Sequence, residues 1–129
     1  MALRFTIDGR LSGTNEYINA CRSNKYAGAE MKKRNQRIVK DSVFDMIVNK
    51  QLRAPRNFPV KFKIDYYEKD ERRDADNIMF GVKFILDSLV NMYILPDDSR
   101  KYVNAIESNV YTDRKNPRIE VEVIENGKR

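Results

Sequence analysis

Residues 60–90 read "VKFKIDYYEKDERRDADNIMFGVKFILDSLV", and the spacing of their apolar residues changes partway along. Apolar and charged side chains alternate over residues 60–66, which predicts a half-buried strand. Residues 77–92 instead carry apolar side chains at i, i+4, i+7, i+8 and i+11, which predicts a helix with one buried face. The charged turn "EKDERR" separates the two. A strand that leads through a short turn into a helix indicates a sheet with helices packed against it.

The rest of the chain adds further elements to this strand and helix. More strands are expected at residues 3–11, 101–113 and 118–125. Residues 114–117, "RKNP", are expected to join the last two as a hairpin loop. A long amphipathic helix is expected from Ala29 to about Lys50, before the helix-breaking Pro55 and Pro59.

The segment "SGTNEYINACRSNKYAG", residues 12–28, is rich in Ser, Asn and Gly and is expected to be long and irregular. The resulting order is β–loop–α–β–α–β–β. It predicts one α+β domain, residues 1–129, with one mixed sheet and two packed helices.

Composition restricts the chemistry. The chain has no histidine, which excludes Ser-His-Asp and Cys-His catalysis and the common zinc sites. Its one cysteine, Cys21, lacks a partner for an internal disulfide and is expected to be a small buried thiol. Carboxylates remain, and these can bind hard cations such as magnesium. No run of apolar residues is long enough for a signal peptide or a membrane span, so we expect a cytoplasmic protein.

Charge is distributed unevenly over the chain, whose net charge is +6. Residues 1–57 carry 12 basic and 5 acidic side chains, whereas residues 58–129 carry 13 basic and 14 acidic ones. A basic half beside a neutral half with paired aspartates suggests that one part attracts a polyanion and the other acts on it. An ordinary basic surface explains the same numbers, so charge alone leaves nucleic-acid binding open.

The motif "DADN" has two explanations. Asp74 and Asp76 lie where a helix is expected to begin, and aspartate is a favoured N-cap and complements the helix dipole. Alternatively, two close carboxylates repel each other, and a divalent cation between them removes the repulsion. A second acidic pair, Asp97 and Asp98, follows the helix. The helix between them is about 24 Å long, so the two pairs meet only if the returning strand begins beside the first pair.

The run "RRDADNIMFGVKFILDSLVNMYILPDDSRKYV", residues 72–103, resembles the active-site region of the RusA-type Holliday junction resolvases, many of which are carried by phages and prophages. The family pattern is R-D-x-D-N, then a lysine four residues before an aspartate, then D-D eleven residues after that aspartate. Here these positions are Arg73 to Asn77, Lys83 before Asp87, and Asp98. Residues 13–33 also resemble the N-terminal segments of phage members.

The resemblance implies a homodimer that binds four-way DNA junctions and cuts two symmetry-related strands with Mg²⁺ or Mn²⁺. Asp74, Asp76 and Asp98 match the essential acidic positions, which hold the metal. Lys83 matches the catalytic lysine. Arg73 matches the basic residue before the acidic motif and is expected to contact DNA. This agrees with the chemistry of phosphodiester cleavage, because a bound metal activates water and stabilises negative charge on the phosphate.

One position departs from the best-known form of the pattern, in which the lysine lies four residues after the second aspartate. Phe80 occupies that position here, and Lys83 lies seven residues after Asp76. Both spacings return to about the same face of a helix. Either the three extra residues lengthen the loop before the helix, or the lysine reaches further. Lys83 is alternatively a surface residue paired with Asp87 at i+4.

Other polar residues have both a functional and an ordinary interpretation. Six basic side chains are candidate phosphate contacts, although plain solvation explains each equally well: Lys32, Lys33, Arg34, Arg37, Lys40 and Lys101. Asn15, Tyr17 and Asn19 are candidates for a loop that orders on DNA. Asn77 is expected to cap a helix or to hold a metal-bound water.

Two other functions remain open. The chain is alternatively a non-catalytic nucleic-acid-binding module whose aspartates only cap a helix, or a nuclease that acts mainly on flaps and forks through the same site.

Overall fold

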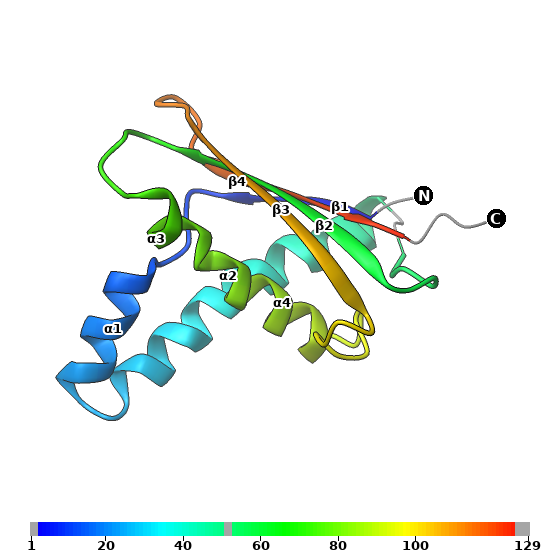
Figure 1. The fold of residues 1–129 in the computed structure, drawn as a ribbon, viewed down its shortest axis with the longest axis horizontal. Helices are drawn as coiled ribbons and strands as arrows, with labels where there is room; N and C mark the ends of the chain where they lie inside the picture. The colour runs from blue at the N-terminus through cyan, green and yellow to red at the C-terminus, as the bar shows by residue number, and fades with distance from the viewer. Residues whose placement is uncertain (1–2, 51–52, 126–129) are drawn as a thin grey trace.

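The computed structural model describes residues 3–50 and 53–125, which form four strands and four helical segments (Figure 1). In chain order the elements are β1 (Leu3–Asp8), α1 (Thr14–Ser23), α2 (Ala27–Lys50), β2 (Val60–Glu68), α3 (Ala75–Met79), α4 (Gly81–Asn91), β3 (Val103–Thr112) and β4 (Arg118–Ile124). The α+β class is therefore confirmed.

The sheet is mixed, as predicted, with strand order β1-β4-β2-β3. β4 is antiparallel to both β1 and β2, whereas β3 is parallel to β2. α3 and α4 form the connection from β2 to β3, and α2 and α4 lie against the same face of the sheet (Figure 1). One acidic pair lies at the start of α3 and the other in the turn after α4. The connection on this face of the sheet therefore positions the candidate site.

The core forms between the sheet and α2 and α4. Residues at every second position of β1, β2 and β4 are buried, as the alternating pattern predicts. From the helices, Val39 and Val43 of α2 and Phe84, Ile85 and Leu89 of α4 are buried against them. The amphipathic faces expected for both helices are therefore confirmed within the described residues; the side chain of Lys50 lies outside them.

The predicted hairpin between the last two strands is wrong, because β2 lies between β3 and β4. β4 buries Ile119, Val121 and Val123 and takes a central position, whereas β3 exposes residues 104–107 and takes an edge. The connection at residues 113–117 must pass over one strand, about 10 Å. Five residues reach about 17 Å, and the Asp113 N–H donates to Glu68 O at the end of β2 (2.6 Å) on the way.

The predicted irregular segment at 12–28 is also wrong, because α1 occupies residues 14–23. α1 lies beside the first turns of α2, away from the sheet (Figure 1). Cys21, expected to be buried, is exposed on α1. The second predicted helix is present but divided at Phe80, which ends α3 and begins α4. The Tyr66 hydroxyl of β2 donates to Met79 O just before this break (3.4 Å), and burial raises the pKa of that hydroxyl.

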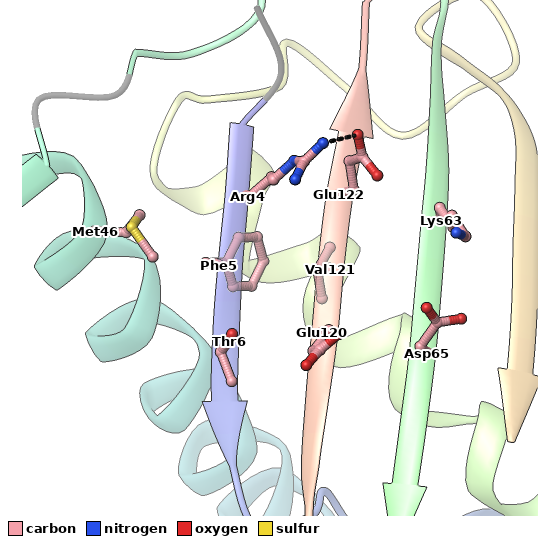
Figure 2. Close-up of a pocket in the computed structure, with 9 residues that line it drawn as sticks. All are labelled: Arg4, Phe5, Thr6, Met46, Lys63, Asp65, Glu120, Val121 and Glu122. Carbon is pink, nitrogen blue, oxygen red and sulfur yellow. Dashed lines mark hydrogen bonds and ion pairs between the residues drawn. The ribbon is translucent and has the colours of Figure 1, made fainter. Parts of the chain in front are cut away.

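The other face of the sheet carries no helix in the described part of the chain (Figure 1). A hollow of about 410 Å³ lies there over β1, β4 and β2 (Figure 2). Arg4 of β1 and Glu122 of β4 form an ion pair across the strands at its edge (3.0 Å). None of the residues predicted to act on DNA lines this hollow. Among the described helices, none has the length and apolar character needed to cross a membrane.

Candidate functional site

Asp74 and Asp76 lie at the start of α3, and both are exposed. Asp74 occupies the N-cap position with extended backbone angles (φ −70°, ψ 155°), but its side chain makes no capping hydrogen bond. Asp76 lies in the first turn. Within residues 3–50 and 53–125, neither carboxylate has a hydrogen-bond or ion-pair partner. Side-chain capping therefore does not account for Asp74, and both carboxylates are available to a cation.

Arg73 fixes the backbone immediately before this pair. Its Nε and Nη2 atoms donate to the two carboxylate oxygens of Glu68 (3.2 and 2.8 Å), and Nη1 donates to Leu11 O (3.2 Å). Both side chains are largely buried, with 12% of Arg73 and 6% of Glu68 exposed. Nη1 also lies 3.5 Å from Glu16 of α1. Arg73 thus joins the end of β2 to the segment before α1, and its guanidinium is engaged by protein acceptors.

Asn77 caps a helix, as one of its two sequence interpretations expected, but the helix is the distant α1. Its Oδ1 accepts a hydrogen bond from the Asn15 N–H in the first turn of α1 (3.0 Å). The N-cap of α1 is Gly13, which has no side chain to do this, and a Cβ there would lie 2.5 Å from Asn77 Oδ1. Glu16 accepts the Gly13 N–H (2.8 Å). Asn77 therefore caps α1 from a distant part of the sequence, and it couples α1 to the acidic motif.

Asp97 and Asp98 lie in the exposed turn that follows α4. Tyr93, with φ 62° and 93% of its surface exposed, ends the helix, and the N–H groups of Ile94 and Leu95 return to Leu89 O. Asp98 borders a hollow of about 370 Å³ together with side chains of α2 and α4: Lys32, Gln36, Asp87, Val90 and Asn91.

The two acidic pairs lie at opposite ends of α4. β3 begins beside the start of β2, where Val103 pairs with Val60, whereas Asp74 follows the end of β2. The returning strand therefore does not begin beside the first acidic pair, which was the condition for the pairs to meet. In the part of the chain that the structure describes, no group of three His, Cys, Asp or Glu side chains is placed to hold a metal.

Lys83 is exposed on α4, one helical turn beyond Phe80. The alternative pairing with Asp87 is not what the structure contains, because Asp87 pairs with Lys32 of α2 (3.5 Å). Among the described residues Lys83 has no ion-pair partner. α3 begins directly after Asp74, and the helix is divided at Phe80, so Lys83 lies on the segment that follows this break.

The basic side chains of α2 form a stripe along the helix, and the hollow that three of them line is formed by α2 residues. Lys33, Arg37 and Lys40 follow at i, i+4 and i+7 and line a hollow of about 340 Å³. Lys32 lies beside them and borders the Asp98 hollow, and Arg34 is exposed. Lys101 is also exposed, with its Nζ 5.5 Å from the centre of the Tyr102 ring.

Two residues that hold the site were missed in the sequence, although signals for both exist. Glu68 continues the buried face of β2, and a carboxylate on a buried face requires a cation such as Arg73. Glu16 lies three residues after Gly13, which is the spacing of a capping box and indicates a helix start at 13–14. The link from Asn77 to Asn15 spans 62 residues and has no local signal.

The chain matches the family model described as "Endodeoxyribonuclease RusA" over residues 13–124. No curated protein matches the chain. The match includes both acidic pairs, the basic stripe and α1. The chain therefore belongs to the RusA endodeoxyribonuclease family, as its resemblance to the junction resolvases implied, and it is an endonuclease of the class that resolves Holliday junctions.

Proposed function

We propose that this chain forms a homodimer that resolves four-way DNA junctions by paired symmetric nicks, with Mg²⁺ or Mn²⁺ at each active site, in recombination and repair of phage or bacterial DNA. One observation carries the proposal. Asp74 and Asp76 present two neighbouring carboxylates that no described protein group neutralises. Arg73 and Asn77 hold the backbone on either side of them.

The donor set suits a hard divalent cation, because Mg²⁺ is bound by one or two carboxylates together with water and phosphate oxygens. Asp74 and Asp76 would hold it. A metal bound there lowers the pKa of a water and acts as a Lewis acid on the phosphate. Lys83 lies on the following helix, and its ammonium group has no ion-pair partner within residues 3–50 and 53–125, so it neutralises the negative charge that develops on the phosphate.

The third acidic residue, Asp98, completes the site of the neighbouring protomer. Within one chain it lies at the far end of α4 from Asp76. A two-fold dimer with the two α4 helices antiparallel brings the Asp98 end of one protomer to the Asp74 end of the other. Each active site is then shared, and the two sites are related by the same symmetry as the two strands cut in a junction.

The basic stripe of α2 provides the electrostatic contact with the DNA backbone. Lys33 and Arg37 are exposed on α2, and Lys32 borders the hollow that contains Asp98, so phosphates can lie along this surface of α2. Arg34 and Lys101 extend the basic surface. Arg73 acts differently, because its guanidinium is engaged by Glu68, and it positions the acidic motif.

The experiment compares the wild-type protein with Asp76→Asn on a synthetic four-way junction, a flap and a linear duplex in Mg²⁺. We expect paired nicks in the junction from the wild type. Loss of a residue that only supports a metal ligand costs 10–100-fold, so loss of a direct ligand lowers nicking by at least about 100-fold. Asp8→Asn removes an exposed carboxylate at the end of β1 and serves as the matched control, which retains activity.

Three results would contradict the proposal. Junction binding without nicking, in Mg²⁺ and in Mn²⁺, would identify a non-catalytic module. Faster cutting of the flap than of the junction would identify a nuclease for flaps and forks. Asp76→Asn with full activity would remove the acidic pair from the mechanism.

A further inference from the structure

Three aromatic rings and three charged side chains surround a small cavity next to the acidic motif. The cavity has a volume of about 170 Å³ and is lined by Tyr17 of α1, Lys32 of α2, Phe80 at the helix break, and Lys83, Phe84 and Asp87 of α4. Phe80 lies four residues after Asp76, about 6 Å along a helix axis. Phe80, which forms one wall of the cavity, is thus about one helical turn from Asp76.

The rings form the walls and floor of this cavity. Tyr17 and Phe80 are partly exposed, with ring centres 5.5 Å apart and planes inclined by 35°. Phe84 is buried beneath them and meets Phe80 edge to face at 5.5 Å. Drug-sized ligands occupy pockets of about 300–1,000 Å³, so this cavity suits a much smaller flat group that stacks on one aromatic face.

The rim carries charges that suit the backbone of a nucleotide. Lys83 has no ion-pair partner among the described residues, and Lys32 lies opposite, paired with Asp87 at 3.5 Å. Aromatic faces between basic side chains are the arrangement with which proteins bind unpaired nucleotides, because bases stack on the rings and phosphates meet the cations. Asp87 supplies a hydrogen-bond acceptor at the same rim.

We propose that the cavity of Tyr17, Phe80 and Phe84 binds one unpaired nucleobase of the DNA substrate, adjacent to the phosphate that Lys83 contacts. This inference rests on the proposed function for the identity of the substrate. A base within a duplex cannot reach the cavity, so it must leave the stack. Bases at the centre of a four-way junction do so at a lower cost, because strand exchange interrupts the stacking there. The cavity therefore favours branched over continuous DNA.

The test measures coupling between the Phe80 ring and individual bases. Wild type and Phe80→Leu are titrated with junctions in which one nucleotide near the crossover at a time is abasic, without divalent metal so that no cutting occurs. Stacking of a base on an aromatic side chain corresponds to a change of about 5- to 150-fold in affinity. We expect Phe80→Leu to weaken binding of the intact junction by this factor. With one specific base removed, the two proteins should bind within about two-fold of each other.

Controls separate this effect from damage to the fold. Phe44→Leu makes the same change at an exposed phenylalanine of α2 and should leave junction affinity unchanged. Phe80→Trp retains a stacking face and should retain the coupling. If the rings serve only to anchor α1, Phe80→Leu lowers the unfolding midpoint and shows the same affinity ratio on every abasic junction, and that result would overturn the inference.

The affinity measurements do not depend on whether the protein cuts the junction. Nicking of the intact junction by the wild type in Mg²⁺ is measured in parallel. Nicking without any base-specific coupling overturns the base pocket and leaves the proposed function intact. Coupling without nicking supports the pocket and contradicts the proposed function.

Discussion

The two ends of α4 differ in how they are held. At the first end, Arg73, Glu68, Asn77 and Asn15 connect the acidic motif to β2 and α1 through hydrogen bonds of 2.8–3.2 Å. At the other end, Asp98 lies in an exposed turn, and within the described residues its carboxylate has no hydrogen-bond or ion-pair partner.

One chain alone therefore arranges the backbone of the first acidic pair, whereas in the proposed dimer Asp98 completes the site of the partner protomer. Functional groups act best when neighbouring residues fix them before the ligand arrives. Arg73 and Asn77 fix the backbone on either side of the first acidic pair within one chain, although the two carboxylates have no partner among the described residues. No side-chain hydrogen bond among the described residues anchors the turn that carries Asp98, so its proposed contribution depends on a second protomer. Substitutions at the two ends of α4 and on α2 test whether the ends differ in this way.

The largest effect is expected for Arg73→Met. It leaves Glu68 buried without its cation, and breaking a buried ion pair in this way costs about 3–5 kcal/mol of the free energy of unfolding. Urea denaturation measures the loss. Arg72→Met is the matched control, because 87% of the neighbouring arginine side chain is exposed and such pairs contribute about 0–1 kcal/mol. Asp98→Asn should change stability by less than about 0.5 kcal/mol. If Arg73→Met and Arg72→Met lose the same free energy of unfolding, the buried ion pair does not hold the first end of α4, and the distinction between the two ends is lost.

Lys83→Gln tests the proposed catalytic lysine, which lies near the first end of α4. Loss of one charge-stabilising donor lowers kcat by about 100- to 1,000-fold. The Mg²⁺ concentration needed for half-maximal nicking should stay the same, since Lys83 is not a ligand. Single-turnover nicking of a junction at several Mg²⁺ concentrations measures both quantities. Lys115→Gln, in the exposed loop before β4, should nick normally. A loss of less than about five-fold for Lys83→Gln would assign the lysine role elsewhere.

Asn77→Ala tests the connection between the acidic motif and α1. Removal of a capping side chain costs about 0.5–2 kcal/mol, because the Asn15 N–H then loses its acceptor. Asn77→Asp keeps an acceptor oxygen near the N-terminus of α1 and should lose less stability in the same denaturation experiment. If Asn77→Ala and Asn77→Asp unfold at the same urea concentration as the wild type, Asn77 does not hold α1.

The smallest effect is expected for the basic stripe. Arg37→Gln removes one phosphate contact, so the slope of log affinity against log salt concentration should fall by about 1. Junction binding at a series of KCl concentrations measures this. Lys61→Gln is the control, because Lys61 pairs with Glu107 on the other side of the molecule (3.1 Å). An unchanged slope for Arg37→Gln would place the DNA away from α2.

Local patterns in the sequence predicted most of the elements. The alternation in β2 and the apolar stripes of α2 and α4 were sufficient, because burial of one face imposes these periods. The neighbours of β4 were not predictable in the same way. A pair of strands joined by five residues suits a hairpin. The central position of β4 is explained only by comparing burial: one face of β4 is fully buried, whereas residues 104–107 of β3 are exposed.

For the candidate site, the sequence supplied the residue types but not their arrangement. Asp74, Asp76 and Asp98 were named from spacing and resemblance, yet the separation of Asp98 depends on the parallel pairing of β2 with β3. Arg73 was interpreted as a DNA contact, because sequence does not show that Glu68 turns inward to meet it. Long-range partners of this kind follow from tertiary packing and have no periodic signature.

The central claim, that each active site combines the first acidic pair of one protomer with Asp98 of the other, is tested most directly by a mixed dimer. Protomers carrying Asp76→Asn and Asp98→Asn are co-expressed with different tags, and the mixed dimer is isolated and given a four-way junction in Mg²⁺. Both substitutions then fall in one site and leave the other intact, so we predict nicking of one strand, as in a control dimer of wild type and Asp76→Asn. A mixed dimer as inactive as the two parent variants would contradict the account, because each protomer would then build its own site.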